Sequence, residues 1–255
     1  MIRTTAGDIE PPLTGIILPH EHIHTDLLPL SEGGDRKVST SVIRQAVEQK
    51  LRRAVRAGVA LLIECTPPYV GQNVEAVAEV GEATRLPVVV ATGLYKESFQ
   101  PPWALNASVS EISDWMMRDL EEGIDGTDVR AGFIKLAVTD GGVTSQEGNI
   151  LSAAIEVSNR TGAAIASHSP VGSNAVHQLK TIEQAGGDTS RYIHMLTPSS
   201  GSTFIWMCFG AGPGLSATGQ AGSPPHCLWT WTSSEKYSTR GLGTGYCFRR
   251  TCAVI

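Results

Sequence analysis

The stretch Val59-Ala60-Leu61-Leu62-Ile63 decides the fold, because it is an uninterrupted apolar run that directly follows a helix-forming segment. Residues 42–57 place their apolar side chains on one helical face and end before Gly58, a residue type that often terminates helices. A strand that is apolar at every position is buried on both faces, as strands of parallel sheets are. This helix and strand therefore predict one unit of an α/β protein.

The same alternation continues outward from this stretch in both directions. A strand is expected at residues 15–19, and further strands at residues 87–92, 131–137, 163–167 and 192–193. Further helices are expected at residues 74–84, 109–122, 147–161 and 174–185. Alternating helices and strands predict a parallel sheet, either doubly wound or closed as a barrel. The expected strands fall short of the eight that a (β/α)8 barrel requires.

Composition divides the chain near residue 196. The 255 residues carry a formal net charge of −5, which argues against nucleic acid or an anionic membrane as the main partner. Of 20 basic and 25 acidic residues, only five lie after residue 196, and none of these is aspartate. Four of the five cysteines lie there, but they form no paired CxxC units and so do not indicate a zinc module. We therefore treat residues 1–195 and 196–255 separately.

Targeting signals are not evident in the sequence. No apolar run approaches the about 20 residues of a membrane span. The first eight residues lack the apolar core of a signal peptide. We therefore expect a cytoplasmic protein.

Nitrogen-bearing side chains accompany three of the expected strands, near the end where parallel α/β proteins carry their active sites. His20 and His22 follow the strand at residues 15–19, and residues two apart in an extended segment share a side, so both can reach one metal. His168 ends another strand, and Lys135 lies inside an apolar one. A buried lysine is costly unless it is paired, modified or beside a metal. Together these residues predict a chemical centre at one rim of the sheet.

Each of these signals also has a plainer interpretation. A histidine pair such as His20 and His22 also occurs in surface loops. Lys135 could extend its amine to solvent from a strand end. His24 continues the alternation, and a supporting or exposed role is expected for it rather than metal binding.

The residues also resemble the phosphotriesterase family of the amidohydrolase superfamily. The similarity lies in residues 15–22, 130–137, 144–147, 161–163, 167–169, 172 and 186–191, and it covers roughly residues 4–195 overall. The resemblance implies a (β/α)8 TIM barrel, recognisable through its sixth strand, and two divalent metal ions, usually zinc.

The resemblance also implies roles for single residues. His20 and His22 would bind one metal ion, His168 would bind the second, and Lys135, once carbamylated, would bridge both as the catalytic residue. A metal-bound hydroxide would attack an ester-type bond in a small molecule, namely an organophosphate triester, a lactone or a carboxyl ester. Tyr95 would face the substrate; the alternative is packing against the loop that holds Trp103. The expected assembly is a homodimer.

The sequence departs from the family in three places. Relatives usually carry Arg-Asp where this chain has Gln72 and Asn73. The usual spacing from His168 places the metal-binding histidine of the sixth strand at Leu196, and His194, on the same side of an extended strand, is the candidate to replace it. The metal-binding aspartate of the eighth strand has no counterpart, since no aspartate follows residue 196.

Two hypotheses account for residues 196–255. Either they are translated out of frame, which the abrupt change in charge and cysteine content favours, or they form a genuine Gly/Ser-rich C-terminal region. The matching functional alternative to a zinc-dependent hydrolase is a catalytically impaired or binding-only barrel.

Overall fold

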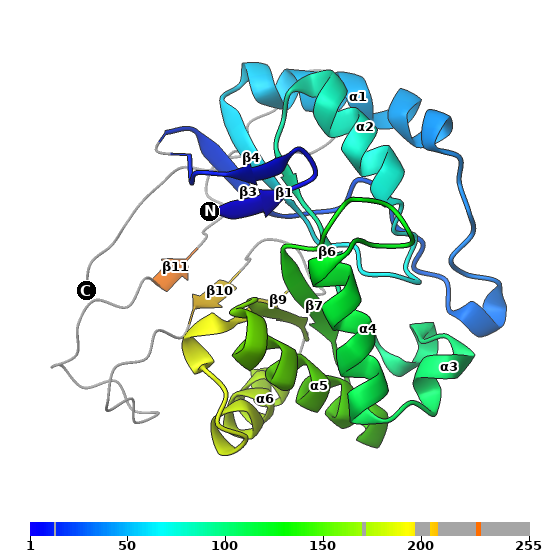
Figure 1. Cartoon of the computed structure of the whole chain (residues 1–255), viewed down its shortest axis with the longest axis vertical. Helices are drawn as coiled ribbons and strands as arrows, with labels where there is room; N and C mark the ends of the chain where they lie inside the picture. The colour runs from blue at the N-terminus through cyan, green and yellow to red at the C-terminus, as the bar shows by residue number, and fades with distance from the viewer. Residues whose placement is uncertain (13, 170–171, 197–204, 209–227, 231–255) are drawn as a thin grey trace, which may run out of the picture.

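A computed structural model describes residues 1–12, 14–169, 172–196, 205–208 and 228–230 of the chain. An antiparallel hairpin of β1 (Ile2–Thr4) and β2 (Gly7–Ile9) opens the fold. No apolar run in the sequence marks this hairpin. After it, strands and helices alternate along the chain (Figure 1).

The alternating part runs from β3 to β9. Its strands are β3 (Ile16–Glu21), β4 (Val59–Glu64), β5 (Val88–Val89), β6 (Ala91–Thr92), β7 (Phe133–Ala137), β8 (Ile165–His168) and β9 (Tyr192–Leu196). Its helices are α1 (Thr40–Arg56), α2 (Val74–Thr84), α3 (Pro102–Leu105), α4 (Val109–Glu121), α5 (Ser145–Thr161) and α6 (Gly172–Gln184). Short 3-10 turns lie at Leu30–Glu32, Glu97–Phe99 and Thr189–Arg191. Among the described residues, none of these helices is both long and apolar enough to cross a bilayer.

Strands β3 to β9 form two parallel sheets, and Val90 lies between the last strand of the first sheet and the first strand of the second. β3, β4 and β5 pair in that order, and β6, β7, β8 and β9 pair in the same way. Only Val90 separates β5 from β6, and its carbonyl accepts a hydrogen bond from the Gly132 amide at 2.9 Å. The single strand predicted at residues 87–92 is therefore interrupted at this point. Strand order equals chain order, which confirms an α/β fold with parallel sheets.

Alternate residues of the strands face two different cores. One face carries what we call the interior cluster, made of Leu61, Cys65, Val89, Ala91, Phe133, Ala166 and Met195. The opposite face packs against helices: α1 on β4, α2 on β5, α4 on β6, α5 on β7 and β8, and α6 on β9 (Figure 1). Because successive side chains point to opposite faces and both faces are covered, the strands are apolar at nearly every position.

Capping boxes fix the starts of two long helices. Ser108 and Glu111 cap α4, and Thr144 and Glu147 cap α5, each by a reciprocal pair of side-chain to backbone hydrogen bonds. Glu147 is buried and also accepts hydrogen bonds from the amides of Thr139 and Glu97. Its carboxylate thus joins the loop after β6, the loop after β7 and the first turn of α5.

The amide pair that departs from the family pattern anchors the loop after β4. Asn73 accepts a hydrogen bond from the Ala76 amide and caps α2. Gln72 is buried and donates to the carbonyls of Thr66 and Ala91, at 2.9 and 2.7 Å. These contacts agree with a role in loop anchoring.

Beyond β9 the described backbone changes direction. β10 (Ile205–Cys208) pairs antiparallel with β9, and β11 (Leu228–Thr230) pairs antiparallel with β10. A further strand–helix–strand unit would add a parallel strand instead. Most of residues 196–255, including the predicted change of reading frame, lies outside the described residues.

Candidate active site

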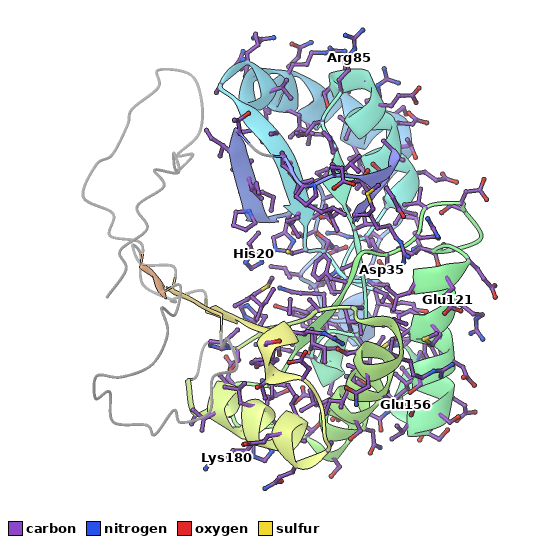
Figure 2. The ribbon with its side chains drawn as sticks, turned by 60° about the vertical axis from the view of Figure 1, so that its left-hand side comes forward. His20, Asp35, Arg85, Glu121, Glu156 and Lys180 are labelled. Atoms are coloured by element: carbon purple, nitrogen blue, oxygen red, sulfur yellow. The ribbon has the colours of Figure 1, made fainter. Side chains whose placement is uncertain are left out.

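One cavity collects the reactive side chains that the sequence singles out. It has a volume of about 240 Å³ and is lined by His20, His22, Tyr95, Lys135 and His168, together with Thr25, Leu27, Pro67 and Val70. The polar residues come from β3, β6, β7 and β8 or from the loops directly after them. In Figure 2, His20 lies at the lower end of the blue strand β3. The structure thus brings together five of the six predicted site residues.

His20 and His22 place two ring nitrogens side by side. Their Nε2 atoms lie 3.1 Å apart, and the rings meet edge to face with centroids 5.0 Å apart. His22 is exposed to solvent, whereas His20 is half-buried. Desolvation by the surrounding protein, and then the charge of Lys135, lower the pKa of both residues, to about 4 for His22. At neutral pH both rings are therefore uncharged, which is the form that binds a metal.

Lys135 lines the cavity from within β7 and is only 1% exposed. The interpretation in which its amine reaches solvent is therefore wrong. Its Nζ atom lies 2.6 Å from the Sδ atom of Met195 in β9. Burial lowers the pKa of Lys135, while Cys65 and Glu64 oppose this effect. The amine is shifted towards its neutral, nucleophilic form.

His168 and Tyr95 form a second aromatic pair, with ring centroids 5.9 Å apart. Burial, followed by the charge of Lys135, lowers the pKa of His168 to about 4. Burial raises the pKa of Tyr95 to about 12, so its hydroxyl keeps its proton and can donate a hydrogen bond. Tyr95 lines the cavity and also packs edge to face on Phe99, in the loop that contains Trp103, with ring centroids 5.3 Å apart. Both interpretations of Tyr95 therefore stay predictions.

Gly93 controls how closely β6 approaches β7. Its φ angle is +113°, and a Cβ atom at this position would collide with the carbonyl oxygen of Lys135. Only glycine combines this backbone conformation with so close an approach. Gly93 therefore sets the point at which Tyr95, two residues later, enters the cavity.

His194 lies on the other face of β9. It stands opposite Ser167 in the strand register, whereas Met195 stands opposite His168 and belongs to the interior cluster. Neighbouring residues of a strand face opposite sides, and His194 is not among the residues that line the cavity. It is 2% exposed, and neither ring nitrogen has a hydrogen-bond partner in the described part of the chain. A metal-binding role for His194 stays a prediction.

Glu64 and Thr66 join the site although the sequence did not single them out. Glu64 is 1% exposed and accepts hydrogen bonds from the amides of Ile23 and Thr66 and from the Thr66 hydroxyl. The same hydroxyl lies 2.8 Å from Nδ1 of His22. Burial raises the pKa of Glu64 to about 7, and the hydrogen bonds from Thr66 and Ile23 oppose this rise. The sequence signal that could have identified Glu64 is a carboxylate directly after the apolar run at residues 59–63.

His24 supports the loop after β4. Its Nδ1 atom lies 2.6 Å from the carbonyl oxygen of Gly71, whose amide donates to Asp35 at 3.1 Å. His24 is not among the lining residues of the cavity. Its position agrees with the supporting role expected from the sequence.

The side chains of the cavity are of types that bind a divalent metal, but they are too few to hold one by themselves. His20, His22 and His168 supply nitrogen donors of the type that zinc binds. Within the described residues, no three His, Cys, Asp or Glu side chains are grouped so that they alone could hold a metal ion. A further donor has to come from Lys135, and only after its amine becomes an oxygen ligand. The residues fit a metal centre on that condition.

These features define the class: an α/β protein with a candidate hydrolytic centre at the ends of parallel strands. The family model of the phosphotriesterase family matches residues 1–197. The chain belongs to this family of metal-dependent hydrolases, as the resemblance in its motifs predicted.

Individual relatives agree with this assignment. The phosphotriesterase homology protein of Escherichia coli is 32% identical over 179 residues, which are 70% of this chain and 60% of that protein. The aryldialkylphosphatase of Saccharolobus solfataricus is 27% identical over 180 residues, which are 70% of this chain and 57% of that protein. A mutant PTE-like lactonase from Deinococcus radiodurans matches with a TM-score of 0.69 at 29% identity, over 76% of this chain and 62% of the lactonase. The chain therefore spans less than two thirds of the length of these relatives.

Proposed function

We propose that this chain is a metal-dependent hydrolase that cleaves an ester-type bond in a small molecule. The observation that carries the proposal is the single cavity shared by His20, His22, Lys135 and His168. The names of two relatives, an aryldialkylphosphatase and a lactonase, support organophosphate triesters and lactones as bond types. Carboxyl esters are the third candidate, because their carbonyl carbon is attacked in the same way.

The proposed cofactors are two divalent metal ions, with zinc as the first choice. His20 and His22 would hold one ion, His168 the other, and Lys135 would lie between them. His194 would contribute as a further ligand only if β9 shifted by one residue, because such a shift exchanges its two faces. Bound divalent cations would lower the pKa of water and polarise the oxygen of the bond under attack.

The proposed role of Lys135 depends on carbamylation by dissolved carbon dioxide. The neutral amine adds to the carbon of carbon dioxide, a nitrogen–carbon bond forms, and one electron pair of a C=O bond moves to oxygen. The nitrogen then releases one proton to solvent water. Burial lowers the pKa of Lys135 and so increases the share of neutral amine that can react. The carbamate replaces an ammonium group that is costly to bury with an anion that cations can neutralise.

The remaining lining residues suit the organic part of an ester. Leu27, Pro67 and Val70 offer apolar surface, which would contact substituents and exclude water from them. The Tyr95 hydroxyl, protonated at neutral pH, would donate a hydrogen bond to an ester oxygen. The uncharged imidazoles would leave their lone pairs for coordination.

We also propose that the two sheets are part of a (β/α)8 barrel and that its sequence ends near residue 195. Chain-ordered parallel strands with helices packed on one face support the barrel, and the change in composition supports the boundary and an out-of-frame tail. Resequencing the gene tests the reading frame. A cytoplasmic location and a homodimer are proposed from the sequence and the resemblance.

Zinc content and hydrolysis, measured on one preparation, test the proposed function. Protein reconstituted with zinc and bicarbonate should hold about two zinc ions per chain and cleave a triester, a lactone or an aryl ester. Lys135→Met should abolish both properties. Lys180→Met, which removes an exposed lysine of α6 (Figure 2), is the matched control and should retain both. Wild-type protein that takes up no zinc and cleaves none of the three would refute the proposal.

A catalytically impaired or binding-only barrel is the second candidate. Met195 favours it, because a sulfur rather than a nitrogen or carboxylate ligand lies beside Lys135. The lack of any aspartate after residue 196 favours it as well. This alternative predicts that zinc binds, as measured by equilibrium dialysis, without turnover of any of the three ester types.

A further inference from the structure

The hydroxyl of Thr66 connects a buried carboxylate to a histidine of the cavity. Its Oγ1 atom lies 2.5 Å from Oε1 of Glu64 and 2.8 Å from Nδ1 of His22. Glu64 ends β4, Thr66 lies two residues later, and His22 directly follows β3. Because β3 and β4 are paired neighbours, the connection lies within one edge of the sheet.

The hydroxyl has one hydrogen to give and three neighbours. Besides Glu64 and His22, the carbonyl oxygen of His24 lies 3.1 Å from Oγ1. A carboxylate and a carbonyl can only accept. The contact with Glu64 is the shortest, and the charge of a carboxylate strengthens such a bond. Whether the hydroxyl donates its hydrogen to Glu64 or to the carbonyl of His24, its oxygen can offer only a lone pair to His22. Nδ1 of His22 therefore has to be the donor.

The surroundings of Glu64 keep its Oε1 atom an acceptor. Its Oε1 receives the amide of Ile23 at 3.2 Å, and its Oε2 receives the amide of Thr66 at 3.1 Å. With the hydroxyl of Thr66, three donors point at one carboxyl group. These donors oppose the rise in the pKa of Glu64 that burial causes. Because two of them point at Oε1, a proton on this carboxyl group would sit on Oε2, and Oε1 would still accept from the Thr66 hydroxyl.

We propose that Glu64, acting through Thr66, is a positioning residue that fixes His22 in the tautomer with hydrogen on Nδ1. The Nε2 atom of His22 then keeps its lone pair, and it is this atom that lies 3.1 Å from Nε2 of His20. The hydrogen bond made by one ring nitrogen generally decides what the other can bind. Presentation of that lone pair to a metal rests on the proposed function, whereas the tautomer is a property of the protein alone.

A second pair in the same protein provides a matched control. Thr92 of β6 donates from its hydroxyl to Oδ2 of Asp119 in α4 at 2.5 Å, and both side chains are buried. This bond has the same type of donor and acceptor, and the same length, as the bond from Thr66 to Glu64. This pair joins a strand to a helix and lies outside the lining of the cavity. Thr92→Val therefore removes an equivalent bond without touching His22.

Histidine tautomers can be measured directly in the full-length chain. Long-range ¹H–¹⁵N spectra of chelator-treated, ¹⁵N-labelled protein should show His22 protonated at Nδ1. Thr66→Val should lose this pattern, Thr66→Ser should restore it, and Thr92→Val should keep it. A wild-type His22 protonated at Nε2, or an unchanged tautomer in Thr66→Val, would overturn the proposal. Should Thr66→Val not fold, the wild-type spectrum alone decides.

Zinc affinity separates this proposal from the proposed function. Thr66→Val should bind zinc about 10–100-fold more weakly than wild type, the usual effect of losing a partner of a ligating histidine, and Thr92→Val should not. If no variant binds zinc but the tautomers behave as expected, the proposed function fails and the positioning role stands. If zinc binds equally well to all variants and the tautomer does not change, the positioning role fails and the proposed function stands.

Discussion

The two faces of the parallel strands both bury polar side chains, but to different ends. On the interior face, Lys135 and His168 open onto the cavity. On the helix-covered face, His194 is buried away from the cavity, and Thr92 bonds to Asp119 of α4. The groups of the interior face converge from several strands, whereas those of the helix face stay alone or pair locally. Burial of a polar residue therefore does not mark a site by itself; convergence on one face does.

Zinc affinity provides the strongest test of this comparison. His168→Asn removes a proposed ligand and should weaken zinc binding by more than the about hundredfold effect of losing a ligand's partner. His194→Asn makes the same chemical change on the other face and should leave zinc affinity nearly unchanged. Competition with a chromophoric chelator measures both. An equal loss in the two variants would show that His194 serves the metal and that the faces do not differ.

The free energy of unfolding should depend on pH with opposite signs for a buried group of each face. Burial raises the pKa of Asp119 to about 6, opposed by the bond from Thr92. Its contribution is therefore fully present below the unfolded pKa of about 3.9 and is lost as pH rises through about 6. His168, with its pKa lowered to about 4, acts oppositely, because its contribution is present above about pH 6.5 and lost as pH falls.

Asp119→Asn isolates the contribution of the helix face. From pH 4 to pH 7.5, wild-type protein should lose about 2 kcal/mol of unfolding free energy relative to this variant. Urea denaturation of chelator-treated protein at both pH values measures the difference. Parallel pH curves for the two proteins would mean that Asp119 does not titrate as described.

The smallest effect concerns the buried imidazole of His194. Neither ring nitrogen has a hydrogen-bond partner in the part of the chain that the structure describes, and a buried unpaired polar group costs about 1–3 kcal/mol. His194→Leu should therefore raise the free energy of unfolding by about 1 kcal/mol, seen as a higher urea midpoint at unchanged slope. A lower midpoint would indicate that His194 has a partner that the variant has lost.

Much of the fold was predictable from the sequence, because strands covered on both faces are continuous apolar runs. The strand at residues 59–63 and the helix at 42–57 were placed within two residues of their observed bounds. The hairpin of β1 and β2 was not predicted, because its three-residue strands carry no apolar run. The interruption at Val90 was also missed, since the apolar pattern continues through it.

The residues of the site could be predicted from the sequence, but the face of the sheet to which each one points could not. His20, His22, Tyr95, Lys135 and His168 all line one cavity. The facing of His194 could not be read from the sequence, because a strand that is apolar on both faces does not reveal which residues point inward. The link through Thr66 was missed for another reason: it joins positions 44 residues apart, and such contacts exist only after the strands have paired.

The carboxylate of Glu147 constrains how the rim of this protein can be engineered. It receives amide hydrogen bonds from Glu97, in the loop after β6, and from Thr139 and Thr144, at the two ends of the loop after β7. A loop exchanged between family members to alter substrate preference would have to return an amide to the same carboxylate. The segments after β6 and β7 are therefore best transplanted together, as one cassette that includes the first turn of α5.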